Sequence, residues 1–362
     1  MLGRGVPHAI AVLLAGFPAG VIASGYTDPS TAPPSQPLAR AADAGPPQAP
    51  ANAPAISHDA RIARYVGYVS AATDIVPGSG AHANVYVVRR KRPWGVDGTP
   101  WHIGPTDLVT RGLGGAPADG DSASPAFGGN DFLAPRCLAF VSAASNLVPH
   151  DRNGRADVFV LGLPGGHLRR IATRGPATAV TVDARCRTFA YVAGGTLYVR
   201  HRTGRVRRVS PPGGVSDPQL SYNGKDVVYA RNGMVVFRHL GASAWVVGPG
   251  AHPVADAFGR YVAFERDGLI YEAGVQSRTP QAIAAGVAPS MTSGGHFVFY
   301  GQGPLVRLNV KKRPIASCPV GDVVDTAGSP HGNYVAYTCS NGGVYLGYAG
   351  SQHGPPPQPQ FP

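Results

Sequence analysis

One polar loop holds the residues whose types and spacing are best suited to chemistry. Asp151, Asn153 and Asp157 place oxygen-bearing side chains around Gly154. Ca²⁺ binds several oxygen ligands, and a glycine allows the tight bend that brings them together. The flanking segments are strand-like and no Glu occupies the twelfth position, so the loop is not an EF-hand. We therefore predict a calcium site at these three residues. The alternative is a polar turn in which Asp151 and Asn153 hydrogen-bond to their own backbone.

The elements around this loop belong to an internal repeat. Residues 136–160 form a strand, a turn-rich loop and a second strand, and residues 65–88 are a near copy. Each repeat has an alternating apolar run that ends in an aromatic anchor, usually after a polar turn. The seven anchors are Tyr68, Phe140, Tyr191, Tyr229, Phe264, Tyr300 and Tyr337. Their spacing from the third anchor onward is 38, 35, 36 and 37 residues, whereas the earlier gaps of 72 and 51 include inserted loops.

Each unit contains about four short strands, and no unit has a helical period of apolar residues. Four antiparallel strands that recur at this interval are typical of β-propeller blades around a channel. The fold class is therefore all-β, with seven four-stranded antiparallel blades and six as the alternative. The seventh unit ends after residues 344–348 and lacks an outer strand. Either residues N-terminal to Ala53 supply that strand or the last blade is short.

The turn-plus-anchor stretch at residues 256–264, Asp-Ala-Phe-Gly-Arg-Tyr-Val-Ala-Phe, resembles the WD40-like repeat of the TolB family of β-propellers. The longer stretch at 136–160 is similar to repeats of secreted bacterial propellers. This resemblance covers nearly all of residues 56–350. It implies a propeller fold and, for most such proteins, a binding scaffold rather than an enzyme. TolB itself has six blades, which is the basis of the six-blade alternative.

The chain contains four cysteines and no Cys-x-x-Cys pair. They are Cys137, Cys186, Cys318 and Cys339. An even number in an exported chain favours disulfides over metal ligation, and three pairings are possible. The first two and the last two cysteines lie in neighbouring repeats. Because neighbouring blades touch, we predict the pairs 137–186 and 318–339. The alternative is four buried thiols.

The two ends of the chain are expected to lie outside the repeat domain. Residues 1–25 combine a weakly basic start, an apolar run and small residues, as in a cleaved signal peptide. Residues 26–55 and 351–362 are rich in proline and are expected to be a disordered linker and tail. The propeller then occupies residues 56–350. No later stretch reaches the length of a transmembrane helix, so we expect a secreted or envelope-associated monomer.

The net charge of +12 is not spread evenly. Basic clusters follow the second strand of several units, which is the strand after the anchor: residues 89–92, 169–170, 205–208 and 311–313. In a propeller these clusters lie on the outer rim. A basic rim favours a protein or an anionic cell-envelope polymer as partner, or it discourages strand-on-strand association. Nucleic acid is not expected, since no stripe of alternating aromatic and basic residues is present.

Enzyme motifs are absent from the sequence. It contains no Gly-x-Ser-x-Gly elbow, no His-Glu-x-x-His and no phosphate loop. Histidines in turns, such as His58 and His331, are expected at the surface. The main hypothesis is an exported, non-enzymatic binding scaffold that needs no cofactor other than the candidate calcium. The alternative is a hydrolase or lyase acting on a carbohydrate or lactone, with carboxylates gathered at the channel mouth. The candidates for that role are Asp59, Asp183, Asp256 and Glu265.

Overall fold

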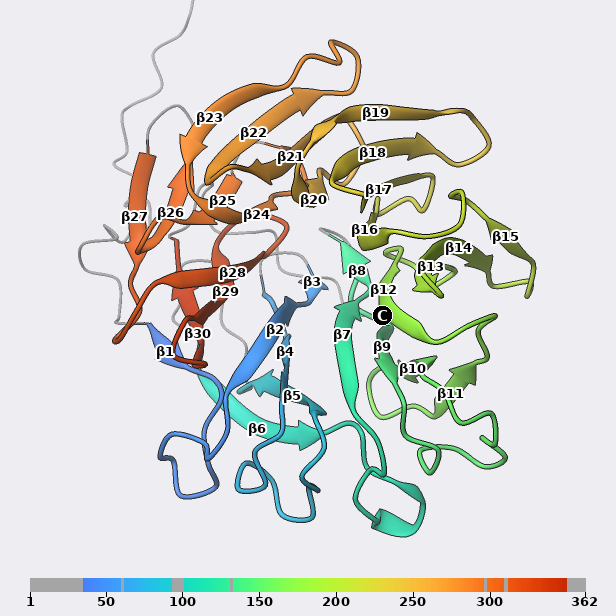
Figure 1. Cartoon of the computed structure of the whole chain (residues 1–362). Coiled ribbons are helices and arrows are strands. Elements are labelled where there is room, and N and C mark those ends of the chain that lie inside the picture. Colours follow the sequence, from blue (N-terminus) through green and yellow to red (C-terminus); the bar gives the residue numbers. More distant parts are fainter. Residues whose placement is uncertain are drawn as a thin grey trace, which may run out of the picture.

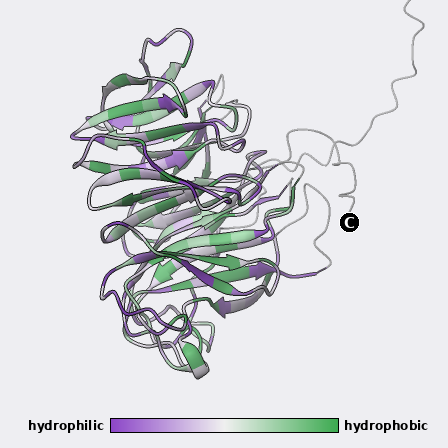
Figure 2. Ribbon diagram, turned by 90° about the vertical axis from the view of Figure 1, so that its right-hand side faces the viewer, coloured by the Kyte–Doolittle hydropathy of each residue, from purple (hydrophilic) through white to green (hydrophobic). Residues whose placement is uncertain are grey.

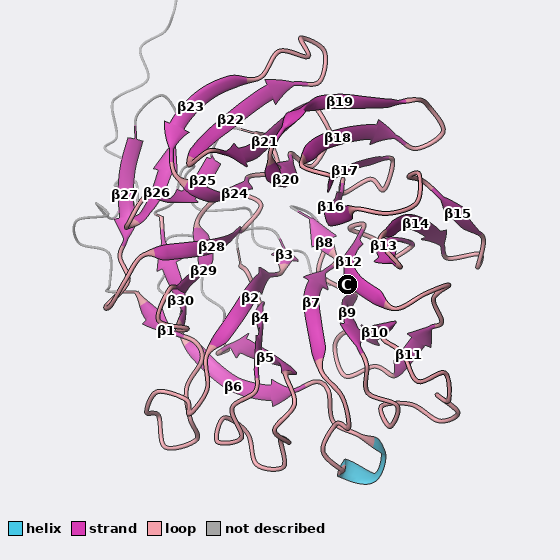
Figure 3. Ribbon diagram, viewed as in Figure 1, coloured by secondary structure: helices cyan, strands magenta, loops and turns pink. Residues whose placement is uncertain are grey.

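Seven four-stranded antiparallel sheets are arranged in a ring around a central channel (Figure 1). The computed structural model describes residues 35–59, 62–92, 101–130, 133–295, 298–308 and 312–349. Strands and loops make up these residues except for one short 3-10 turn, Leu113–Gly115 (Figure 3). The predicted fold class is confirmed, and the blade count is seven.

The strands follow one another blade by blade. Blades 1 and 2 contain β2 (Ala51–Ile56), β4 (Tyr65–Ser70), β5 (Asn84–Arg90) and β6 (Ile103–Leu108), then β7 (Ser122–Phe127), β9 (Cys137–Ser142), β10 (Asp157–Gly162) and β11 (Leu168–Ile171). Blades 3 and 4 contain β12 (Ala177–Val182), β13 (Thr188–Ala193), β14 (Thr196–His201) and β15 (Val206–Arg208), then β16 (Val215–Leu220), β17 (Asp226–Arg231), β18 (Met234–His239) and β19 (Ala244–Pro249).

Blades 5 and 6 contain β20 (Ala251–Ala255), β21 (Tyr261–Arg266), β22 (Leu269–Gly274) and β23 (Gln281–Ala285), then β24 (Val287–Met291), β25 (Val298–Gly301), β26 (Leu305–Leu308) and β27 (Lys312–Ala316). Blade 7 contains β28 (Val323–Gly328), β29 (Tyr334–Cys339), β30 (Val344–Tyr348) and, from the start of the chain, β1 (Gln36–Pro37). A separate parallel pair is formed by β3 (His58–Asp59) and β8 (Gly129–Asn130).

The N-terminal segment closes the ring. Strand β1 pairs with β30, with Gln36 opposite Leu346 and Pro37 opposite Tyr345, and supplies the outer strand of blade 7. The first of the two closure schemes predicted from the sequence is therefore confirmed. Residues 35–55, which we expected to form a linker, instead belong to the propeller. The proline-rich composition suggested a linker, but an edge strand needs few large side chains and tolerates proline. Few residues of this segment are buried, among them Leu38 and the small Ala51.

The aromatic anchors form the centre of each blade. All seven lie on the second strand of their blade and are at most 1% exposed. In five blades the anchor stacks on the aromatic residue directly opposite it on the third strand, with ring centroids 5.5 to 5.7 Å apart. Such cross-strand pairs stabilise a sheet and fix its register. In side view hydrophobic and hydrophilic residues alternate along the strands, as expected for blades packed face to face (Figure 2).

Candidate functional site

The central channel is lined by the innermost strand of every blade. These strands are β2, β7, β12, β16, β20, β24 and β28, and each contacts the next around the ring. A cavity of about 180 Å³ lies among the later residues of these strands. Its walls include Ile56, Phe127, Leu220, Val254 and Met291, with fewer polar residues among them.

A belt of main-chain hydrogen bonds connects the turns at one end of the channel. Strand β3 of blade 1 pairs with β8 of blade 2, and the two lie at the centre of the ring (Figure 1). Five further bonds of 2.8 to 3.1 Å continue from blade 2 to blade 7: Gly129 N to Ala184 O, Ala184 N to Tyr222 O, Tyr222 N to Ala257 O, Ala257 N to Ser293 O, and Ser293 N to Pro330 O. These bonds hold the channel-lining turns at fixed positions relative to one another.

Two aromatic rings meet at this end of the channel. His58 of blade 1 packs on Tyr222 of blade 4, with ring centroids 4.8 Å apart. The two blades lie on opposite sides of the ring, so the pair spans the channel. Burial lowers the pKa of His58 to about 4. His58, which we expected at the surface, is half-buried on β3 and faces the channel cavity.

The four carboxylates proposed for an enzyme are each used within the scaffold. Asp183 accepts hydrogen bonds from the backbone of Arg187 and Thr188, and Asp256 accepts one from Tyr261 N at 3.1 Å. Asp59 accepts hydrogen bonds from Ser57 Oγ and Arg64 N, and Glu265 accepts one from Ala288 N. Burial raises the pKa of Asp59 to about 7. The four groups close turns or join blades. Asp59, Asp183 and Asp256 do so at the belt end of the channel, where Asp256 also lines the cavity.

A different set of ionisable residues lies near the other end of the channel. Every inner strand has one register shift against its neighbour. At such shifts a bulge redirects a side chain, and Asp217 and His252 have positive φ angles of 47° there. Burial raises the pKa of Asp325 to about 6, the charge of His252 opposes this shift, and that of Asp217 adds to it. The sequence contains no signal for this group, because bulge positions depend on how the blades pack.

The predicted calcium loop brings its three side chains together, and an arginine lies among them. Asn153 Nδ2 donates to Asp157 Oδ2 at 2.6 Å, and Thr173 donates to Asp157 Oδ1 through both its backbone N and its hydroxyl. The Arg170 guanidinium pairs with Asp151 and lies 3.4 Å from Asp157 Oδ2. In the described residues no group of three or more His, Cys, Asp or Glu side chains is arranged to hold a metal. Calcium binding at this loop stays a prediction.

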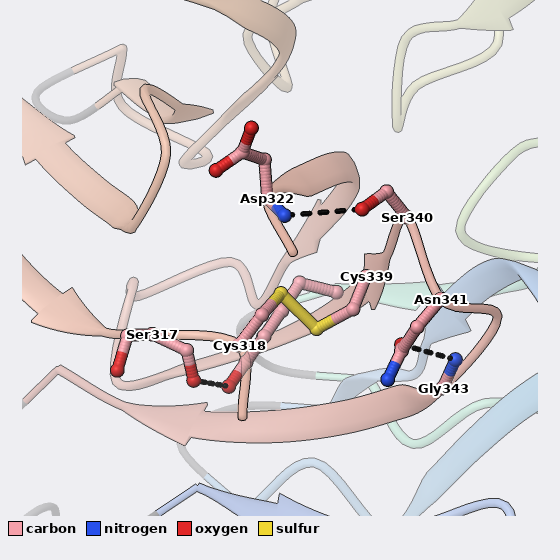
Figure 4. Close-up of a disulfide and its surroundings, with 8 residues drawn as sticks. Ser317, Cys318, Asp322, Cys339, Ser340, Asn341 and Gly343 are labelled. Carbon is pink, nitrogen blue, oxygen red and sulfur yellow. Dashed lines mark hydrogen bonds between the residues drawn. A yellow bond between two sulfur atoms is a disulfide. The ribbon is translucent and has the colours of Figure 1, made fainter. Parts of the chain in front are cut away.

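Both predicted disulfides are present. Cys137 on β9 bonds to Cys186 in the turn of blade 3, with Cα atoms 6.1 Å apart. Cys318, which follows β27, bonds to Cys339 on β29, with Cα atoms 5.8 Å apart (Figure 4). Each bond joins neighbouring blades, and the second lies beside the blade that β1 completes.

The positive charge is concentrated on one side of the ring. Residues 137–249, from β9 to the end of blade 4, contain 15 Lys and Arg but only 5 Asp and Glu, which leaves +10 of the total +12. The clusters on β11, β15 and β27 do lie on outermost strands, as predicted. Arg90 does not: it is 4% exposed, donates to Ile62 O and lies over the Tyr334 ring. Lys311 lies outside the described residues.

The outer hairpin of blade 3, β14 and β15, is the centre of this basic edge. Residues 200–208 contain five arginines and one histidine without an acidic residue. Four of the arginines are exposed: Arg202, Arg205, Arg207 and Arg208. On one side Arg169 of blade 2 lies over the Phe189 ring, and burial together with the nearby Arg200 lowers the pKa of Arg169. On the other side Arg207, Arg208 and Arg238 line a shallow hollow between blades 3 and 4.

Among the comparisons with known proteins, the one with solved structures finds matches, and these concern the fold. No family model matches the chain, and no curated protein does. A chain of the "Crystal Structure of Mitotic Checkpoint Complex" superposes with a TM-score of 0.60 at 10% identity, covering 96% of this chain and 99% of that one. In all, 1085 solved chains match, so this architecture by itself selects no function. The chain has a WD40-like seven-blade propeller fold. In the parts of the chain that the structure describes, no helix is long and apolar enough to cross a membrane.

Proposed function

We propose that this protein is an exported, non-enzymatic propeller that binds an anionic cell-envelope polymer through the outer hairpin of blade 3 and the basic edge around it. One observation carries the proposal: residues 200–208 gather five arginines and no carboxylate. Like charges at close range raise the free energy of a folded chain unless a counter-charge is bound. A polyanion supplies that counter-charge, and Arg is well suited to sulfate and phosphate groups because its guanidinium donates in a planar fork.

Export is part of the same proposal. The two disulfides are compatible with an oxidising compartment, and the first 25 residues have the composition of a signal peptide. Those residues lie outside the described part of the chain. N-terminal sequencing of secreted protein should find a start near Ser24 or Tyr26, and an intact Met1 in that material would refute export by cleavage.

The binding experiment uses dextran sulfate as a model polyanion and measures Kd at several salt concentrations. The test variant replaces Arg202, Arg205, Arg207 and Arg208 with alanine. Four exposed charge contacts of about 0.5 kcal/mol each amount to about 2 kcal/mol, roughly a 30-fold increase in Kd at low salt. The difference should shrink as salt screens the contacts.

A second variant of equal net charge is the matched control. It replaces four exposed basic residues on other blades with alanine: Arg111, Arg266, Arg278 and Lys312. If the polyanion responds only to total charge, the two variants bind equally well and the proposed edge is wrong. If the first variant alone loses affinity, the hairpin of blade 3 is the binding site.

A protein with an acidic surface is the second candidate partner. The superposed chain belongs to a complex by its title, which favours a role in protein binding for this fold. A pull-down from envelope extract with the wild type and the arginine variant distinguishes the two. Recovery of one protein by the wild type alone, insensitive to enzymes that degrade polysaccharide, would favour the protein partner.

A further inference from the structure

The cavity in the central channel has a floor with unused hydrogen-bonding capacity. His58 and Tyr222 both line the cavity and pack on each other from opposite sides of the ring. Among the described residues the two imidazole nitrogens of His58 have no hydrogen-bond partner, although burial lowers the pKa of the ring to about 4. A neutral imidazole has one N–H donor and one acceptor nitrogen. The floor therefore presents both kinds of group to whatever occupies the cavity.

Several polar groups on the walls are already paired. Thr326 Oγ1 donates to Ala288 O at 2.8 Å and lies 2.9 Å from Ser290 Oγ. Asp256 accepts from the Tyr261 backbone and pairs with Arg260. Most other wall residues are apolar, among them Ile56 and Met291. The one carboxylate in the lining, Asp256, is already paired with Arg260, so the cavity offers no free charge. It therefore favours an uncharged ligand, since a charged one would lose its hydration without a counter-charge.

The size of the cavity limits the ligand to about one ring. Its volume is about 180 Å³, and a protein cavity of about 150 Å³ with apolar walls is large enough to bind benzene. The aromatic pair at the floor also favours a flat ligand, because stacked or edge-on aromatic contacts stabilise a complex beyond the area that they bury.

We propose that the channel cavity binds an uncharged single-ring aromatic ligand that carries a hydroxyl group. The ring packs against the apolar walls and Tyr222, and the hydroxyl hydrogen-bonds to His58. This site lies on the inner strands, whereas the basic edge lies on the outer ones, so the inference does not depend on the proposed polyanion.

Phenol is the probe, and the side-chain NMR signals of the histidines are the readout. The His58 signal should shift in a saturable way, while that of His239, which is exposed on the rim and paired with Asp226, should not. Benzene lacks the hydroxyl and should bind about fivefold more weakly, the effect of one hydrogen bond. His58→Phe keeps an aromatic ring against Tyr222 but removes both nitrogens, so it should reduce phenol affinity to the benzene level.

A second variant guards against misfolding at His58. Ala255→Leu leaves the floor intact and fills part of the cavity from the wall of blade 5, so it should abolish binding of both probes. Three results would overturn the inference: no saturable shift at His58, equal shifts at His58 and His239, or unchanged phenol affinity in Ala255→Leu. Any of them would mean that the cavity holds only water.

Discussion

Truncation of Leu38 tests whether the N-terminal segment closes the ring. Leu38 is 1% exposed, its backbone N donates to Val344 O at 2.8 Å, and its side chain belongs to the apolar cluster at the junction of blades 7 and 1. A buried Leu→Ala substitution removes apolar contacts and leaves a cavity, at a cost of about 2–5 kcal/mol. The site is near the ring's edge and can partly collapse, so we expect about 3 kcal/mol for Leu38→Ala.

The assay is equilibrium unfolding in urea, with hydrogen exchange as a local readout. Leu113→Ala is the control, because Leu113 is 51% exposed and its truncation should change the free energy of unfolding by at most about 0.5 kcal/mol. Amide protection should fall at Leu38 and along β30 but not in blade 3, since an opened closure exposes the edge that β1 covers. Equal unfolding free energies for the two variants, or unchanged protection on β30, would refute closure by β1.

Three further predictions concern the crosslinks, the channel and the polar loop. The disulfide that includes Cys186 closes a loop of 49 residues, so replacing both of its cysteines should lower the free energy of unfolding by about 4 kcal/mol. The disulfide that includes Cys339 closes a loop of 21 residues, and its removal should lower that free energy by about 3 kcal/mol. Urea titrations would measure both losses. Asp325 has a pKa raised to about 6, so the fold loses stability as pH rises from about 4 to 6. Asp325→Asn should lack this loss, which is a relative gain in the free energy of unfolding of up to about 3 kcal/mol at pH 7. Parallel curves of unfolding free energy against pH for the two proteins would contradict this prediction. Calcium at 2 mM should raise the thermal midpoint of the wild type by about one to a few degrees. The rise should be larger in Arg170→Ala, which lacks the competing cation, and absent in Asp151→Ala. Identical midpoints in calcium and EDTA for all three proteins would exclude the site.

The features that could be predicted from the sequence are those that repeat. The aromatic anchors recur at a nearly constant interval because each blade buries one at its centre, so seven anchors predicted seven blades. The disulfides followed from the same count, since cysteines in adjacent units lie in adjacent blades. In contrast, the pair of His58 and Tyr222 joins units three apart in the ring. Nothing local in either turn indicates that contact, because it arises only when the ring closes.

Irregular backbone accounts for most of what the sequence did not show. Asp217 and His252 lie at bulges of the inner strands, where φ is positive without a glycine. A strict two-residue alternation would place their side chains differently, so pattern reading could not group them with Asp325. The segment that includes β1 was predicted only as one of two ways to close the ring, and its residues were otherwise assigned to a linker, for a related reason. Its two paired residues contribute main-chain hydrogen bonds rather than an apolar pattern, and backbone pairing has no compositional signal.

The separation of the two candidate sites leads to a last prediction. The basic hairpin of blade 3 is the outer half of its sheet, and the cavity is lined by the inner strand, three strand spacings or about 14 Å away. Sites so far apart without shared partners contribute additively to binding. A protein with both the four-arginine and the His58→Phe changes should therefore lose polyanion affinity as the first variant does and phenol affinity as the second does, within about 0.5 kcal/mol in each case. A larger deviation would show that the belt of hydrogen-bonded turns transmits occupancy of the channel to the rim.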